Sequence, residues 1–383
     1  MRTPTARTGR ATARVDEHGS LPFRNRARHG PRPLGRAIRG GRPPLLAESS
    51  CGGVPPQTTE QREERERAHN LHSAAIGACL ARAEKDPALV ERARLLLSEE
   101  ARLPFMTADE VARANAELSR TLRELRADPA PRPSGATPED LGRELTDAEQ
   151  DALFDLALRD RLTGVPREHP RLLLLGGQPG SGKSTLQRLL LPVLPPGTVS
   201  YDGDDLLPLS PDYEWSMTVD DRAASTSVSA QVGGVHRRAM EHVRRGRHDV
   251  VCSHPLGRAD WAAQWVHGFR EAGYRVEVGF VATHASNSRF SMVDRHERAT
   301  RDQGFGRWLP EIHHDRFYLG VPNTIEFLET HHLADSVYVL SREGEVLYAN
   351  HQRGGAWRSE PFGRIALEAE RGRRELWRSE DAP

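Results

Sequence analysis

This chain of 383 residues has few cysteines and no long apolar run, and each of these features argues against a class of protein. Only three cysteines occur (Cys51, Cys79 and Cys252), without a C-x-x-C spacing, which argues against a disulfide framework and against a thiolate zinc site. No apolar run approaches the ~20 residues that a transmembrane helix needs. The N-terminus is basic but lacks the apolar stretch of a secretory signal. We therefore expect a cytoplasmic protein with no membrane partner.

Lysine is nearly absent as well. Of the 54 lysine and arginine residues only two, Lys85 and Lys183, are lysine. A chain this biased toward arginine keeps lysine at few positions, so we expect a specific chemical need where one remains. With so few lysines, the N-K-x-D motif by which GTPases recognise their base is also missing.

The formal net charge of zero conceals an uneven distribution, because residues 1–50 hold 11 arginines against three acidic residues. Residues 1–61 are also rich in Pro, Gly and Thr and show no sustained apolar period, which predicts a disordered tail. Such a tail can be a basic arm that touches nucleic acid or a membrane, or it can be a solvated tail or an upstream start-site extension. The lack of interleaved aromatic residues favours the second interpretation, so nucleic acid is not an expected partner.

The rest of the chain divides into four predicted segments. Apolar residues at helical spacing predict a helical segment over 62–126, followed by a Pro-rich linker over 127–138. The main domain is expected over 139–350, and a C-terminal extension with a helix over 351–383. Within the domain, Thr146 and Glu149 form a predicted capping box that opens a helix to about Leu162.

Beyond that helix, short apolar strands alternate with helices. The alternation indicates βαβ units, and hence an α/β domain with a mostly parallel sheet flanked by helices. A turn at Glu343–Glu345 predicts one further short strand by a hairpin. The predicted strands are 171–176, 198–202, 249–252, 275–282 and 336–341, and the predicted helices are 183–191, 224–245, 259–272, 286–301, 310–330 and 363–379.

The strongest motif is a phosphate-binding loop of the form G-x-x-x-x-G-K-[ST], placed between a predicted strand and a predicted helix. Its glycines let backbone N–H groups point at phosphate oxygens, and the following helix presents its positive N-terminal end. Lys183 is expected to reach the β- and γ-phosphates of ATP, and the Ser184 hydroxyl to bind Mg²⁺. The expected ATP-binding residues are Gly177, Gln178, Pro179, Gly180, Ser181, Gly182, Lys183, Ser184 and Thr185.

A phosphate loop alone does not specify the reaction, because GTPases, motor ATPases and small-molecule kinases share it. Three aspartates, Asp202, Asp204 and Asp205, follow the second strand and either include a general base or form a solvated turn. Arg295, on a predicted helix, and Arg307, in a Gly-bearing loop, can cover the transferring phosphate from a lid. Charge alone favours a solvated or ion-paired role for both arginines.

The residues that carry this pattern resemble the zeta toxin family of bacterial phosphotransferases over about residues 146–350. The run from Leu174 to Ser184 is similar to the phosphate loop of that family, and Asp202-Gly203-Asp204 is similar to its D-x-D segment. The resemblance implies that Asp204 is the general base. Asp294-Arg295-His296-Glu297 is similar to the E-R-x-E helix of the family. Arg307, with His314-Asp315 after it, is similar to the segment that carries the family's lid arginine.

The resemblance also implies the reaction: ATP-dependent phosphorylation of UDP-N-acetylglucosamine at its 3′-hydroxyl, which would poison cell-wall synthesis. An antitoxin protein is an implied partner, and helices 62–126 are expected to act on the kinase domain in a related way. The acceptor half departs from the family pattern, because Cys252-Ser253-His254 follows the third strand where the family has an acidic residue. Two further interpretations stay open: a kinase of the same fold for another small molecule, such as an antibiotic or a dinucleotide, and a non-catalytic ATP-binding module.

Histidines give weaker signals. No third ligand accompanies Cys252 and His254, so a metal is not expected there. Adjacent histidines on a helix point to different sides, so His313 and His314 are expected to be solvated or to cap the helix.

Overall fold

The computed structural model describes residues 57–129 and 143–373. The tail predicted over 1–61 lies almost wholly outside these residues, as do most of the predicted linker and the last part of the predicted terminal helix. Within the described ranges, no helix is both long enough and apolar enough to span a membrane.

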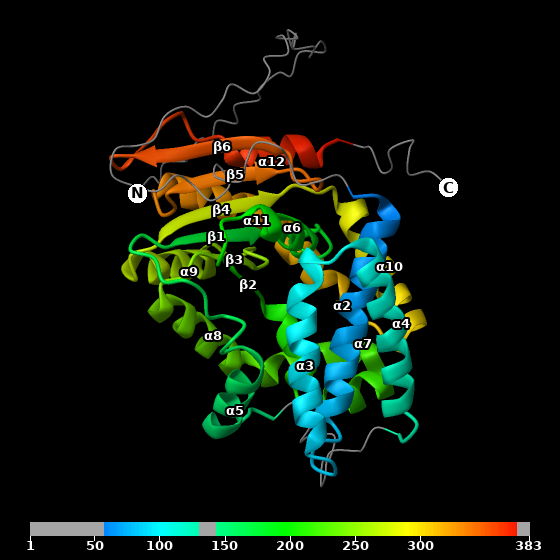
Figure 1. Ribbon diagram of the computed structural model, residues 1–383. Helices are drawn as coiled ribbons and strands as arrows, with labels where there is room; N and C mark the ends of the chain where they lie inside the picture. Colours follow the sequence, from blue (N-terminus) through cyan, green and yellow to red (C-terminus); the bar gives the residue numbers. More distant parts are fainter. Residues whose placement is uncertain (1–56, 130–142, 374–383) are drawn as a thin grey trace, which may run out of the picture. The chain divides into compact units, whose positions relative to one another are not determined.

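A seven-stranded sheet with the order β2-β3-β1-β4-β5-β6-β7 forms the centre of the fold (Figure 1). The first five strands in the chain pair in parallel, and β6 and β7 are added antiparallel. This arrangement confirms the predicted α/β class with a mostly parallel sheet. The strands are β1 (Arg171–Gly176), β2 (Val199–Asp202), β3 (Val250–Ser253), β4 (Arg275–Val281), β5 (Ser336–Leu340), β6 (Val346–Arg353) and β7 (Ala356–Trp357).

Helices connect the strands and precede the sheet. Four of the described α-helices precede β1 in the chain: α2 (Thr59–Leu80), α3 (Ala88–Arg102), α4 (Ala108–Leu125) and α5 (Asp147–Ala157). The others are α6 (Lys183–Leu190), α7 (Tyr213–Gln231), α8 (Gly233–Gly246), α9 (Ala259–Glu271), α10 (Ala285–Gln303), α11 (Glu311–Thr330) and α12 (Gly363–Arg371). Short 3₁₀ segments are η1 (Leu103–Phe105), η2 (Leu191–Val193) and η3 (Gly203–Leu209).

Two helix predictions need correction. The helix expected over 224–245 is two helices, α7 and α8, and α7 begins already at Tyr213. The mixed polar run after Pro211 hides this start, which is stabilised by the burial of Tyr213 and Met217 rather than by a clear apolar period. The capping box at Thr146 is present, but α5 ends at Ala157, before the expected Leu162.

The N-terminal helices share the main hydrophobic core with the sheet and its helices. Helix α2 lies between α3 and α4 (Figure 1), and its buried Leu71 and Ile76 belong to the same apolar cluster as Tyr213 on α7. Full burial of one such side chain contributes roughly 1.5–3 kcal/mol. At Gly77 an added Cβ would lie 2.4 Å from the ring of Tyr213, so only glycine permits this close approach of α2 and α7.

Candidate active site

The phosphate loop lies between β1 and α6, at the carboxyl edge of the parallel strands. Its glycines adopt left-handed backbone angles, with φ of 147° at Gly177, 73° at Gly180 and 96° at Gly182. A Cβ at Gly180 would lie 2.0 Å from the carbonyl oxygen of Ser288 on α10, so the loop packs directly on that helix. The loop residues therefore form the backbone curl that a phosphate site requires.

Three basic side chains converge on this loop. Lys183 Nζ donates to the carbonyl oxygen of Gln178 at 3.0 Å, and burial lowers the pKa of Lys183 to about 8. Burial also lowers the pKa of Arg295, and the charge of Arg307 adds to that effect. The Nε atoms of Arg295 and Arg307 are buried and donate to no acceptor among the described residues. Such a concentration of cations is a site for an anion.

The carboxylate among these cations is Asp204, which follows β2 in η3. Its side chain forms an ion pair with Arg307, and its backbone N–H donates to the Asp202 carboxylate at 3.0 Å. The Asp204 side chain is still 49% exposed. Partial desolvation would raise its pKa, but the charges of Arg307, Arg295 and Lys183 outweigh this effect and hold the pKa below its usual value. Asp204 is therefore ionised at neutral pH and able to accept a proton.

Mg²⁺ prefers oxygen ligands, and two oxygen donors face the space beside α6. Ser184, at the start of that helix, and Asp202, at the end of β2, line one cavity of about 220 Å³. The donor set fits the ion, with Ser184 as the loop residue that would hold it.

Imidazole and indole rings cluster where β3 leads into α9. The rings of His254 and His236 lie 5.0 and 5.3 Å from that of Trp265, and Tyr201 shares a hydrogen bond with His236. Burial lowers the pKa of both histidines to about 4, so both rings are neutral at pH 7. Ser253 donates to Gln187, and Cys252 is buried. This wall is largely aromatic, and both of its histidines are uncharged.

A sequence model of the zeta toxin family matches residues 155–353, which include the phosphate loop, Asp204 and both arginines. The chain belongs to the zeta toxin family. The family is one of ATP-using, P-loop kinase-like toxins, which agrees with the resemblance drawn from the motifs.

Zeta toxins of two bacteria show the extent of the similarity. "Toxin zeta" of Enterococcus hirae is 23% identical over 205 residues, which cover 52% of this chain and 72% of that protein. "Toxin PezT" of Streptococcus pneumoniae is 23% identical over 215 residues, covering 54% of this chain and 82% of that protein. A solved structure from the PezAT toxin-antitoxin system of Streptococcus pneumoniae has a TM-score of 0.49 and 19% identity, covering 59% of this chain and 95% of that chain.

Helix α2 lies outside the part of the chain that matches the zeta toxin family, yet it contacts the site. Glu63 pairs with Arg298 at 2.7 Å, and Arg67 with Asp302 at 3.4 Å, both on α10, the helix that carries Arg295. The negative charge of Glu66 favours the charged forms of Arg295 and Arg342. Arg342 packs against the phosphate loop, since its Cγ would lie 3.3 Å from a Cβ added at Gly182. The N-terminal helix therefore places an acidic side chain near the cations of the phosphate site.

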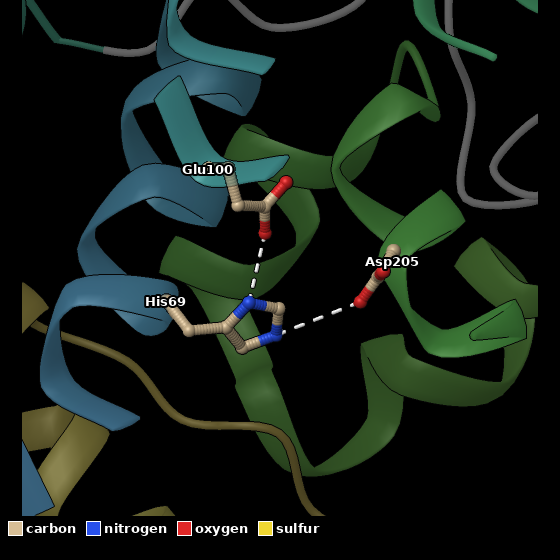
Figure 2. Close-up of side chains that lie close together, drawn as sticks. All are labelled: His69, Glu100 and Asp205. Carbon is tan, nitrogen blue, oxygen red and sulfur yellow. Dashed lines mark ion pairs between the residues drawn. The ribbon is translucent and has the colours of Figure 1, made fainter. Parts of the chain in front are cut away.

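A second contact joins the N-terminal helices to the loop that carries Asp204 (Figure 2). His69 on α2 lies 2.8 Å from Glu100 on α3 through Nδ1, and 3.6 Å from Asp205 through Nε2. Arg161 approaches the same two carboxylates, at 3.4 Å from Glu100 and 2.7 Å from Asp205. One imidazole and two carboxylates can bind a divalent cation, but here the Arg161 guanidinium already neutralises them, so the cluster is an ion-pair network.

This network separates the roles of the neighbouring aspartates. Asp205 turns away from the phosphate site toward Arg161 and His69, and burial raises its pKa to about 6. Asp204 turns toward Lys183 and the two arginines. No local pattern in the sequence points to His69, Glu100 or Arg161, because charged residues at distant positions look solvated until the fold brings them together.

His314 contradicts the expectation of a solvated or capping histidine. Its side chain is fully buried, and its Nε2 and Nδ1 lie 2.8 Å from Ser288 Oγ and from the Asp315 carboxylate. Since Ser288 lies on α10 against the phosphate loop, His314 supports the wall of the site.

Proposed function

We propose that this zeta toxin family member transfers the γ-phosphoryl group of Mg-ATP to an alcohol, and that the acceptor is a sugar nucleotide such as UDP-N-acetylglucosamine. The observation that carries the proposal is the convergence of Lys183, Arg295 and Arg307 on the phosphate loop around the carboxylate of Asp204. Three cations suit a triphosphate, and an ionised carboxylate among them suits a proton acceptor.

On the donor side, the loop amides and Lys183 hold the phosphates. Lys183 leaves the Gln178 carbonyl oxygen for the β- and γ-phosphates, and the buried Nε atoms of Arg295 and Arg307 gain acceptors. Bound Mg²⁺, held in part by Ser184, supplies further neutralisation of the phosphate charge.

On the acceptor side, the reaction requires Asp204 to separate from Arg307. The triphosphate attracts Arg307 to the transferring group and frees the carboxylate. The acceptor hydroxyl oxygen then bonds to the γ-phosphorus, the bond from that phosphorus to the bridging oxygen breaks, Asp204 takes the hydroxyl proton, and ADP leaves.

Fewer observations support the identity of the acceptor than support the binding of ATP. His254, which interacts with the charges of Lys183 and Asp204, presents a flat neutral ring beside the phosphate site, after the third strand, where the family has an acidic residue. Its ring lies 5.0 Å from that of Trp265. Flat rings can stack on a sugar or a base, which suits a sugar nucleotide and equally a dinucleotide. Two more candidate functions stay open: phosphorylation of an antibiotic, and ATP binding without catalysis.

An acceptor panel tests the proposal directly. Purified protein is mixed with ATP, Mg²⁺ and UDP-N-acetylglucosamine, dinucleotides or antibiotics, and mass spectrometry follows the gain of one phosphate on each acceptor. Phosphorylated UDP-N-acetylglucosamine, absent with the Asp204→Asn variant, supports the proposal. Transfer to another acceptor refutes the substrate but not the chemistry. ATP binding without transfer to any acceptor supports the non-catalytic module instead.

We further propose that access to the site is restrained, either by an antitoxin protein or by α2 of the chain itself. The ion pairs of Glu63 and Arg67 with α10, together with the charge of Glu66 near Arg295, support the second possibility. Removing α2 to α4 would expose the main apolar cluster. Point variants of Glu63 and Glu66 therefore test the restraint better than a deletion does.

A further inference from the structure

A buried arginine from the C-terminal helix reaches the phosphate loop. Arg371 is the last residue of α12, and only 4% of its surface is exposed. Its guanidinium donates to the Gln178 side-chain oxygen at 2.7 Å and to the Tyr318 carbonyl oxygen at 2.7 Å. The guanidinium carbon also lies 4.1 Å from the ring centre of Tyr318. Arg371 lies beyond residue 353, where the match to the zeta toxin family ends.

Arg371 differs from its neighbours in having no carboxylate partner. On the same helix, Arg364 pairs with Glu326 and Glu368. Among residues 57–129 and 143–373, no carboxylate forms an ion pair with Arg371, and its buried Nε donates to no acceptor. A buried charge satisfied only by neutral oxygens and a ring face costs stability. Burial lowers the pKa of Arg371 to about 10, so the side chain still carries its charge at pH 7.

The acceptor of Arg371 is a residue of the phosphate loop itself. Gln178 is fully buried, and its Nε2 donates to the Thr283 carbonyl oxygen at 2.8 Å and to Ser288 Oγ at 3.2 Å. Because a guanidinium can only donate, Arg371 determines which end of the Gln178 amide is the acceptor. The Gln178 backbone oxygen also accepts a hydrogen bond from Lys183 Nζ at 3.0 Å. Arg371 therefore fixes the loop residue on which the catalytic lysine rests.

We propose that Arg371 is a positioning residue of the nucleotide site: it holds the phosphate loop through Gln178, and its buried charge behind the loop favours the binding of a triphosphate. The inference rests on the proposed ATP-dependent function. This role explains why a guanidinium without an ion pair is kept buried. Its charge can attract a bound anion through the protein interior, where screening is weak. The C-terminal helix is then part of the nucleotide site and not a packing extension.

The matched test compares Arg371→Met with Arg364→Met on the same helix. Calorimetry measures the Kd of the parent and both variants for MgATP and MgADP, well below the Tm of each protein. Arg371→Met should raise both Kd values about tenfold or more while leaving the Tm unchanged or higher, since it replaces a buried charge by an apolar side chain of similar length. Arg364→Met should bind both nucleotides as the parent does. Arg371→Lys keeps the charge but loses the fork, so it should recover part of the affinity.

Three outcomes overturn the inference. If the parent binds MgATP and Arg371→Met binds it with the same Kd, Arg371 has no role in the nucleotide site, while the proposed function stands. If Arg371→Met lowers only the Tm, the residue is merely structural. If the parent binds no MgATP, the proposed function fails first and this inference with it. Should Arg371→Met not fold, Arg371→Lys decides, because an unchanged Kd there shows that the guanidinium's hydrogen bond to Gln178 has no role in nucleotide binding.

Discussion

Replacing Asp204 by Asn tests the proposed chemistry most directly, since it keeps the shape of the side chain and removes the proton acceptor. A positioned carboxylate typically contributes ~10²–10⁴-fold by accepting the proton of a weakly nucleophilic hydroxyl. We therefore expect kcat to fall at least ~100-fold, which corresponds to about 2.7 kcal/mol of barrier. Asp204 also places a negative charge beside Lys183, Arg295 and Arg307. Its removal strengthens the positive field that a triphosphate meets, so the Kd for MgATP should stay equal or decrease.

The assay separates these two effects. Single-turnover transfer to the best acceptor gives the chemical step, and calorimetry gives the Kd for MgATP. Both are measured at pH 7, about one unit below the Lys183 pKa of about 8, so that the lysine stays largely charged in the parent. A loss of rate with unchanged or tighter ATP binding is the signature of a lost general base.

Asp205→Asn is the matched control, one residue away. Asp205 pairs with the half-buried Arg161 at 2.7 Å, and Arg161 also lies 3.4 Å from Glu100, so the arginine keeps one carboxylate when Asp205 is replaced. This variant should change the Tm little and transfer phosphate within a few-fold of the parent rate. If Asp204→Asn keeps near-parent turnover while Asp202→Asn or Asp205→Asn is inactive, the wrong carboxylate has been assigned. If all three variants transfer normally, the base lies elsewhere and the mechanism is wrong.

Three further variants probe the site and its contacts with α2. Lys183→Ala should weaken MgATP binding and abolish transfer, and unchanged affinity and rate would remove the ATP assignment. Glu66→Gln should lower the Kd for MgATP a few-fold, because it removes an anion that competes for Arg295 and Arg342; an unaltered Kd contradicts a restraint by α2. Glu100 and Asp205 raise the pKa of His69 against the opposing effect of burial. The stabilisation that charged His69 gives to the folded protein is therefore complete below the unfolded-state pKa of 6.5, and it is lost as the pH rises through the folded-state pKa. The free energy of unfolding lost in His69→Gln should thus shrink as the pH rises above 6.5, and a constant loss by urea titration would refute the charge on His69.

The sheet and the phosphate loop could be predicted because their signals are local. The run Leu172–Leu175 is apolar throughout and is buried throughout, as a central parallel strand requires. The loop motif follows it without a gap, and its glycines take the positive φ values that the motif needs. Fold class and family could be predicted from these residues alone, whereas the catalytic roles of Asp204, Arg295 and Arg307 stay predictions.

The contacts around the site could not be predicted, because they join side chains that are distant in sequence. Arg371 and His69 look like ordinary polar helix residues, and no local pattern distinguishes them from solvated neighbours such as Arg364. Adjacent helical histidines diverge, but that rule does not say which of His313 and His314 faces the core. Only the docking of α11 against α10 decides that His314 is the buried one.

The bond between Gln178 and Arg371 joins residues 193 positions apart, and this separation has a consequence for synthesis of the chain. A ribosome adds about 5–20 residues per second, so the phosphate loop is made roughly 10–40 s before its arginine exists. During that interval the strands, the loop and Asp204 can already be present, but the residue that orients Gln178 is not. Translation that stops anywhere before Arg371 therefore releases a phosphate loop without this support. By the order of its residues, the chain makes the phosphate loop and Asp204 well before the arginine that we propose to hold Gln178 in place.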